Sequence, residues 1–106
     1  MDFIDHLDGN VIVSDAAGVI IYMNQRAIAQ YGREIIGTNL LDCHNERSRA
    51  KIREIMETGT SNVYTIEKKG KKKIIYQTPW KENGEFKGIV ELSLEIPAEM
   101  PHFVRE

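Results

Sequence analysis

The sequence is poor in several residue types and has little net charge. It has one cysteine, three prolines and one tryptophan, and its net charge is −2. A single cysteine excludes an intrachain disulfide and agrees with a reducing cytoplasm. The small negative charge argues against a general affinity for nucleic acid. Apolar runs such as residues 19–23 are far shorter than the roughly 20 residues that cross a membrane. We therefore expect a cytoplasmic protein that contacts neither nucleic acid nor membrane.

The composition is otherwise that of a globular protein, with 42% hydrophobic and 28% charged residues. A chain of 106 residues suffices for one domain with a modest core, so we treat residues 1–106 as one domain. The sequence has no Gly-rich phosphate loop and no zinc-ligand spacing. Cys43 and His44 are the only adjacent nucleophile and base, and neighbouring side chains usually point apart. We predict no enzymatic activity, no catalytic residues and no metal site.

The first half of the chain predicts two short strands followed by helices. Two β-branched stretches joined by a tight turn at Gly18 favour a hairpin. Asn24 and Asn45 are suited to cap two helices, and Gly59 is suited to end the second. The expected strands are residues 10–15 and 19–24, the expected helices 25–31 and 45–59, with a single turn at 33–37 and a helical turn or short helix at 1–8.

The second half predicts three strands, at residues 62–68, 73–80 and 86–96. Asn83 and Gly84 between the last two form the strongest short hairpin signal. In the last strand we expect the apolar side to face the core, with Ile89 as an exception on the outer side. That apolar side comprises Phe86, Val90, Leu92, Leu94 and Ile96. The element order and the one-sided strands indicate an α+β fold, in which helices cover one face of an antiparallel sheet.

Three stretches resemble the PAS domain family. Residues 10–27 are similar to its opening, residues 36–41 to the step before its long helix, and residues 84–91 to its last strand. The residues that stand close to the opening pattern are Asp15, Gly18, Ile21 and Asn24. The resemblance covers about residues 5–97, so we expect residues 98–106 to form an extended tail. Residues 41–48 look like a branch of the family with a Cys-His pair before the long helix.

The resemblance implies a five-stranded antiparallel sheet in the order 2-1-5-4-3, with short helices and one longer helix over one face. It also implies a pocket between that face and the helices, which the family uses for haem, flavin, small metabolites or nothing. The implied role is a sensor in signal transduction that binds an unknown small molecule. Because no output region such as a kinase is recognised in the chain, we expect it to act as a homodimer or through a signalling partner. A haem or redox sensor and a ligand-free dimerisation module remain alternatives.

Cys43 and His44 are the first candidate site. His44 has the chemistry of an axial haem ligand, and the pair has that of a redox or metal site. The alternative is that Cys43 is a small core residue and His44 braces the start of the helix. The pattern favours this alternative, because two adjacent ligands rarely make a whole site. Haem stays open, whereas the displaced position of the cysteine relative to the flavin photosensors of the family makes flavin less favoured.

Aromatic and polar residues of the fourth strand are the second candidate site. Tyr76, Thr78 and Trp80 share one face and suit the lining of a pocket. Ordinary core or an outer dimer patch is the alternative, because alternation does not tell which face is covered. Weaker candidates of the same kind are Tyr22, Tyr31 and Met56.

Arg47 and Ser48 lie near the expected N-terminus of the long helix. The positive end of a helix dipole and the free backbone N–H groups there suit an anionic ligand. The same two residues would equally serve to cap and solvate the helix. Both interpretations remain open from the sequence.

Overall fold

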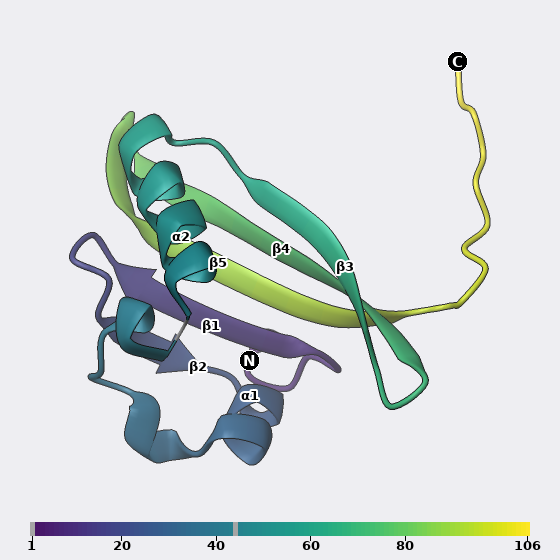
Figure 1. Cartoon of the computed structure of the whole chain (residues 1–106), viewed down its shortest axis with the longest axis horizontal. Coiled ribbons are helices and arrows are strands. Elements are labelled where there is room, and N and C mark those ends of the chain that lie inside the picture. The colour runs from purple at the N-terminus through teal and green to yellow at the C-terminus, as the bar shows by residue number, and fades with distance from the viewer. Residues whose placement is uncertain (1, 44) are drawn as a thin grey trace.

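The structure is a computed structural model that describes residues 2–43 and 45–106, with only the backbone of Cys43. Figure 1 shows a curved sheet with helices on one side of it and a C-terminal segment that leaves the body. In chain order the elements are β1 (Asn10–Asp15), β2 (Ile20–Met23), α1 (Gln25–Tyr31), the 3-10 helices η1 (Arg33–Ile35) and η2 (Leu40–Cys43), α2 (Glu46–Thr58), β3 (Asn62–Lys68), β4 (Lys71–Glu82) and β5 (Glu85–Ile96).

The five strands form one sheet in the order β2-β1-β5-β4-β3. Every neighbouring pair is antiparallel, and β5 lies between β1 and β4. The last strand of the chain therefore joins the N-terminal hairpin to the β3–β4 hairpin. This arrangement confirms the predicted α+β fold and its strand order.

Capping residues set the helix boundaries as the sequence predicts. The side-chain oxygen of Asn24 accepts a hydrogen bond from the Ala27 N–H at the start of α1. Asn45 does the same for Ser48 at the start of α2. Such caps satisfy N–H groups that have no partner within the helix. Gly59 ends α2 in the left-handed conformation, at a φ of 69°, which glycine adopts without steric cost.

The hairpins of the C-terminal half have two-residue turns. Asn83 and Gly84 have positive φ angles of 54° and 79°. In the preceding hairpin, Lys69 and Gly70 have positive φ angles of 54° and 77°. Turns of this conformation match the right-handed twist of the flanking strands. The strands extend right up to these turns, so β4 is longer at both ends than the predicted residues 73–80.

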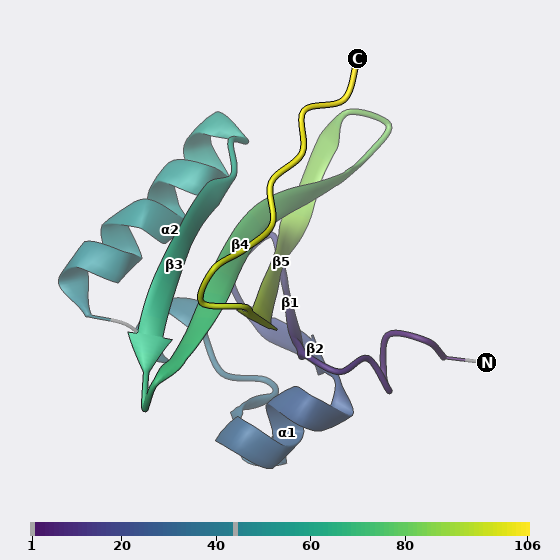
Figure 2. The same ribbon diagram turned by 90° about the vertical axis from the view of Figure 1, so that its right-hand side faces the viewer.

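The core lies between the sheet and the helices. Ile52 and Ile55 of α2 are buried against Ile12 of β1 and Ile89 of β5. The other buried members of this cluster are Ile20, Met23, Ala27 and Leu40. In β2 the buried residue is Ile20, whereas Ile21 is half exposed. Figure 2 shows α2 running alongside one face of the sheet, and burial of its apolar stripe fixes it there.

The predicted orientation of β5 is wrong. Ile89, expected on the outer side, is 2% exposed and belongs to the core. Across the sheet, Ile12 pairs with Glu91 and Glu91 pairs with Gln77, so this row lies on the helix-covered face. The alternate residues Val90, Leu92 and their neighbours therefore lie on the uncovered face. The more apolar side of β5 is the one that the helices leave open.

A bulge explains why Phe86 does not follow Val90. The pairing of β4 with β5 shifts between Trp80 and Lys81: Trp80 pairs with Gly88, and Lys81 with Phe86. The extra residue in β5 reverses the alternation of side chains. Phe86 therefore packs against the core, as predicted, although Val90 lies on the opposite face.

The chain termini lack helices and strands. Residues 3–6 form turns, with one hydrogen bond from the Leu7 N–H to the Ile4 carbonyl, and the apolar side chains of Phe3, Ile4 and Leu7 are exposed. Residues 97–106 have no regular structure and extend away from the sheet (Figure 1). None of the helices in the described ranges is long and apolar enough to span a membrane.

Candidate functional site

A pocket of about 370 Å³ lies between α2 and the strands β3 and β4. We call it the α2 pocket. Its size falls within the range of about 300–1,000 Å³ typical of small-molecule sites. It is lined by Arg47, Ser48, Lys51, Asn62, Tyr64 and Gln77. A pocket between the sheet and the helices is what the family resemblance implies.

The floor of the α2 pocket is a row of polar side chains that crosses three strands. The Asn62 amide donates to Gln77 Oε1 at 2.9 Å, and Gln77 Nε2 donates to Glu91 Oε1 at 2.7 Å. The three residues are direct cross-strand neighbours on β3, β4 and β5. Gln77 is only 4% exposed. Burying such a group is costly unless it is hydrogen-bonded, so the row is held together by its own bonds.

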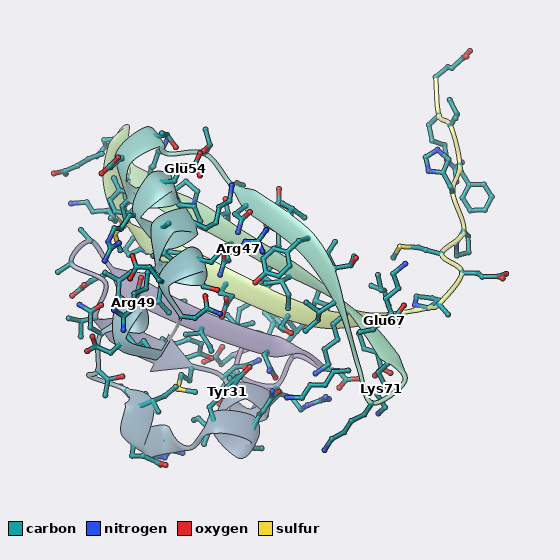
Figure 3. All side chains as sticks on the ribbon, viewed as in Figure 1. Tyr31, Arg47, Arg49, Glu54, Glu67 and Lys71 are labelled. Atoms are coloured by element: carbon teal, nitrogen blue, oxygen red, sulfur yellow. The ribbon has the colours of Figure 1, made fainter. Side chains whose placement is uncertain are left out.

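The wall of the α2 pocket carries two cations, Arg47 and Lys51, one turn apart on the helix. Lys51 lies 3.4 Å from Glu54, and Glu46 pairs with Arg49 and Arg53. Arg47 has no acidic partner in the part of the chain that the structure describes. Figure 3 shows its side chain reaching from α2 towards the sheet. Glu46 and Glu54 thus engage other cations of α2 and leave the Arg47 guanidinium to the pocket.

A smaller pocket of about 190 Å³ adjoins the first beneath α1. Tyr64 lines both, and Tyr31 of α1 and Glu91 of β5 line the smaller one. Burial raises the pKa of Tyr31 and of Tyr64, and the negative charge of Glu91 raises both further. Both phenols therefore stay protonated and can donate hydrogen bonds. The α2 pocket carries the cations Arg47 and Lys51, and the smaller pocket carries the carboxylate of Glu91 together with the cations Lys68 and Lys73.

The structure distributes the predicted site residues over different environments. Tyr31 lines the smaller pocket, whereas Met56 packs against the core. The hydroxyl of Tyr22 donates to Asp5 Oδ1 at 3.1 Å. This bond and the burial of the ring raise the pKa of Tyr22 to about 12. Tyr22 thus holds the N-terminal segment and lines neither of the two pockets.

Tyr76, Thr78 and Trp80 do not lie on the helix-covered face. Tyr76 is 40% exposed and pairs with Leu92 on the uncovered side of the sheet. Thr78 contacts Ser61, and the Trp80 indole donates to the Ser14 carbonyl at 3.2 Å. Their face is therefore not the inner one, because the alternate residues Ile75 and Gln77 are the buried ones. Whether any of the three contacts a ligand stays a prediction.

The hypothesis that Cys43 and His44 form a site concerns residues that the structure describes only in part. The backbone of Cys43 ends η2, whereas its side chain and His44 lie outside the described residues. Among the residues that are described, no group of three or more His, Cys, Asp or Glu side chains is placed to hold a metal ion. The role of the pair therefore stays a prediction.

Sequence reasoning missed Asn62, Tyr64, Gln77 and Glu91. Each of the three strands carries a polar side chain at the same level of the sheet. This row can be recognised only when the pairing of the strands is known. Arg47 and Ser48, by contrast, were noted from their place at the helix start, with anion binding and helix capping both left open. The structure brings them together with Asn62, Tyr64 and Gln77 in the α2 pocket, whereas Glu91 lines the smaller pocket.

No protein-family model matches the sequence, and no curated protein matches it closely enough to count as a relative. Solved structures do share its architecture. The PAS domain of the histidine kinase ThkA superposes with a TM-score of 0.67 at 17% identity, over 81% of this chain and 98% of that one. The chain has the PAS fold. The α2 pocket is thus the space between the sheet and the long helix of the PAS fold.

Two structures from Vibrio cholerae are similar to this chain in the same way. A sensory box sensor histidine kinase has a TM-score of 0.68 at 16% identity, over 90% of this chain and 87% of that one. The Aer2 receptor, a dual PAS-haem oxygen sensor, has a TM-score of 0.62 at 16% identity, over 84% and 95% of the two chains. What these two structures share with the present chain is the arrangement of helices and strands.

Proposed function

We propose that this PAS domain is a sensory module that binds a small ligand in the α2 pocket and signals through contacts with a second copy or a partner protein. The observation that carries the proposal is the hydrogen-bonded row of Asn62, Gln77 and Glu91, with Gln77 buried at its centre beneath the pocket. A sheet that only had to pack against α2 would bear apolar residues there. Departures from apolar core packing are expected where function requires them.

The position of the row supports a signalling role. Its three residues belong to β3, β4 and β5, whose other side is the uncovered face. A ligand that exchanges hydrogen bonds with Asn62 or Gln77 therefore acts on the same strands that a partner would contact. If the ligand binds one arrangement of these strands more tightly than another, it shifts the population towards the arrangement that it binds better.

Native mass spectrometry tests the proposal. The purified protein, incubated with the small-molecule fraction of a cell lysate, is expected to hold one bound molecule per chain. Gln77→Leu removes the centre of the row and is expected to abolish this binding. Thr78→Val, on the uncovered face of the same strand, serves as the matched control and is expected to retain it. If the wild type holds no molecule, or if both variants bind as the wild type does, ligand sensing in this pocket is wrong.

Similarity to the haem-containing Aer2 receptor favours a test of the haem alternative. A visible absorption spectrum after haem reconstitution answers it. A Soret band that disappears in His44→Ala would support haem ligation by His44, and a shift on oxidation that is lost in Cys43→Ser would support a redox role. A colourless protein that takes up no haem would exclude haem as the cofactor. A colourless, ligand-free dimer would instead favour the dimerisation module.

A further inference from the structure

We infer that the ligand of the α2 pocket is a small organic anion, with a carboxylate or phosphate group bound by Arg47 and Lys51. This inference rests on the proposed function, since it names the chemical class of the ligand for the same pocket. Three features of the described residues carry it: an uncompensated cation, hydrogen-bond donors around it, and a negative charge that fixes the orientation of the ligand.

The uncompensated cation is Arg47. Its guanidinium lines the pocket, while Glu46 and Glu54, the acidic residues beside it on α2, lie within 4.0 Å of other cations. The chain as a whole has a net charge of −2, so the positive wall does not follow from a generally basic surface. A guanidinium presents paired N–H donors that match a carboxylate or a phosphate, and such charge-assisted bonds are among the strongest in proteins.

Further donors surround this cation. The Ser48 side chain and the Asn62 amide line the pocket next to Arg47. The Tyr64 hydroxyl forms no hydrogen bond with any described residue, and its raised pKa keeps it protonated. The N-terminal turn of α2, which contains Arg47 and Ser48, adds the positive end of a helix dipole of 13 residues. Each of these groups favours a negatively charged oxygen over a neutral one.

Glu91 fixes the orientation. Its carboxylate accepts from Gln77 at the end of the row away from Arg47, so an anionic group in direct contact with that carboxylate would be repelled. The anionic end of the ligand therefore lies against α2, and the neutral or hydroxylated part extends over Gln77 towards Tyr64. Lys68 and Lys73 line the smaller pocket together with Glu91, so negative charge is disfavoured only beside the carboxylate itself.

Two probes of matched shape test the charge requirement. Malonate and malonamide differ in charge but little in size, and inorganic phosphate adds a second anion. Each is titrated into the ¹⁵N-labelled full chain at constant ionic strength and followed by two-dimensional NMR. We expect malonate or phosphate to shift amides of residues 47–51, 62–64 and 77 with saturation, and malonamide to leave them unmoved.

Three variants locate the anion. Arg47→Gln is expected to weaken binding of the anion roughly ten- to hundred-fold, as the loss of a charge-assisted hydrogen bond predicts. Lys51→Gln is expected to weaken it less, because Lys51 also contacts Glu54. Arg53→Gln is the matched control: Arg53 is an exposed cation of the same helix, pairs with Glu46 and lies outside the pocket. It is expected to bind like the wild type.

The results separate this inference from the proposed function. Malonamide binding as tightly as malonate, unchanged anion binding in Arg47→Gln, or no binding of malonate and phosphate would each overturn the anionic class. If a neutral molecule is nevertheless retained in native mass spectrometry and lost in Gln77→Leu, the sensory pocket stands with a different ligand. If neither anions nor lysate molecules bind, both proposals fail.

Discussion

Asn24 connects more of the molecule than any other single side chain described above. It is fully buried, and its Oδ1 accepts from the N–H groups of Val11 and Ala27. Its Nδ2 donates to the carbonyls of Gly9 and Ile4, at 2.8 and 3.1 Å. One amide thus joins the N-terminal segment, β1 and the start of α1. This explains physically why an asparagine at this position, noted from the sequence as a helix cap and as part of the opening PAS pattern, matters for the fold.

We predict that Asn24→Ala lowers the free energy of unfolding by about 3–5 kcal/mol. The loss of the cap accounts for about 1 kcal/mol, and each buried backbone group left without a partner adds about 1–3 kcal/mol. Asn45→Ala provides the comparison, because Asn45 is exposed and, among the described residues, its side chain bonds only to the Ser48 N–H as a cap. It should cost about 1 kcal/mol. Urea unfolding followed by circular dichroism measures both, and equal losses in the two variants would contradict the connecting role of Asn24.

At the scale of the elements, the sequence predicts where strands and helices occur but not which face of a strand is covered. Caps and hairpin turns are local, so Asn24, Asn45 and Asn83 identify them directly. The covered face depends on contacts with α2, and here it carries Gln77 and Glu91 instead of the more apolar residues. The bulge before Gly88 adds a reversal that simple alternation does not contain.

The floor of the pocket lay beyond sequence reasoning for the same reason. Gln77 is 15 residues from Asn62 and 14 from Glu91, and only the strand register makes them neighbours. Arg47 and Ser48 could be noted in advance, because their place at a helix start is a local property. The resemblance to the PAS family predicted a pocket between the sheet and the helices. The polar residues on its floor could be identified only from the strand register.

The N-terminal segment is attached to β2 by a titratable contact. Tyr22 donates to Asp5, and burial followed by this bond raises the pKa of Tyr22 from 10.0 to about 12. Because the folded chain holds this proton more tightly than the unfolded chain, the resulting stabilisation is complete below pH 10. It is lost as the pH rises from 10 towards 12.

We therefore predict that the stability of the wild type falls more steeply above pH 10 than that of Tyr22→Phe, which has no phenolic proton to lose. Urea unfolding at a series of pH values measures the difference. Asp5→Asn removes the acceptor charge and should lower the pKa of Tyr22 only in part, because burial is the larger cause. Parallel pH profiles for wild type and Tyr22→Phe would contradict this contact.

Considered as a whole molecule, the sheet departs from the usual distribution of polarity in one part, beside the apolar core that contains Ile12, Ile20 and Ile89. An antiparallel sheet with one open face generally carries apolar residues on the covered side and polar residues on the open side. Here the row of Asn62, Gln77 and Glu91 is covered, and a row of Val63, Tyr76 and Leu92 faces outward. Exposed apolar patches of this kind mark contact surfaces. The polarity thus supports both halves of the proposed function, a pocket on one side and a second chain on the other.

The dimer is best tested on β3, where residues three apart lie on opposite faces. Val63 is 46% exposed and pairs with Tyr76 on the uncovered side, whereas Ile66 is 37% exposed and pairs with Lys73 on the helix side. We predict that the wild type is a dimer and that Val63→Glu weakens it at least ~100-fold, because a charge would be buried without a partner. Ile66→Glu, of similar exposure and identical chemistry, should leave it intact. Analytical ultracentrifugation over a range of concentrations measures both, and a monomeric wild type, or equal dissociation by the two variants, would show that the outward face does not join two copies of this chain.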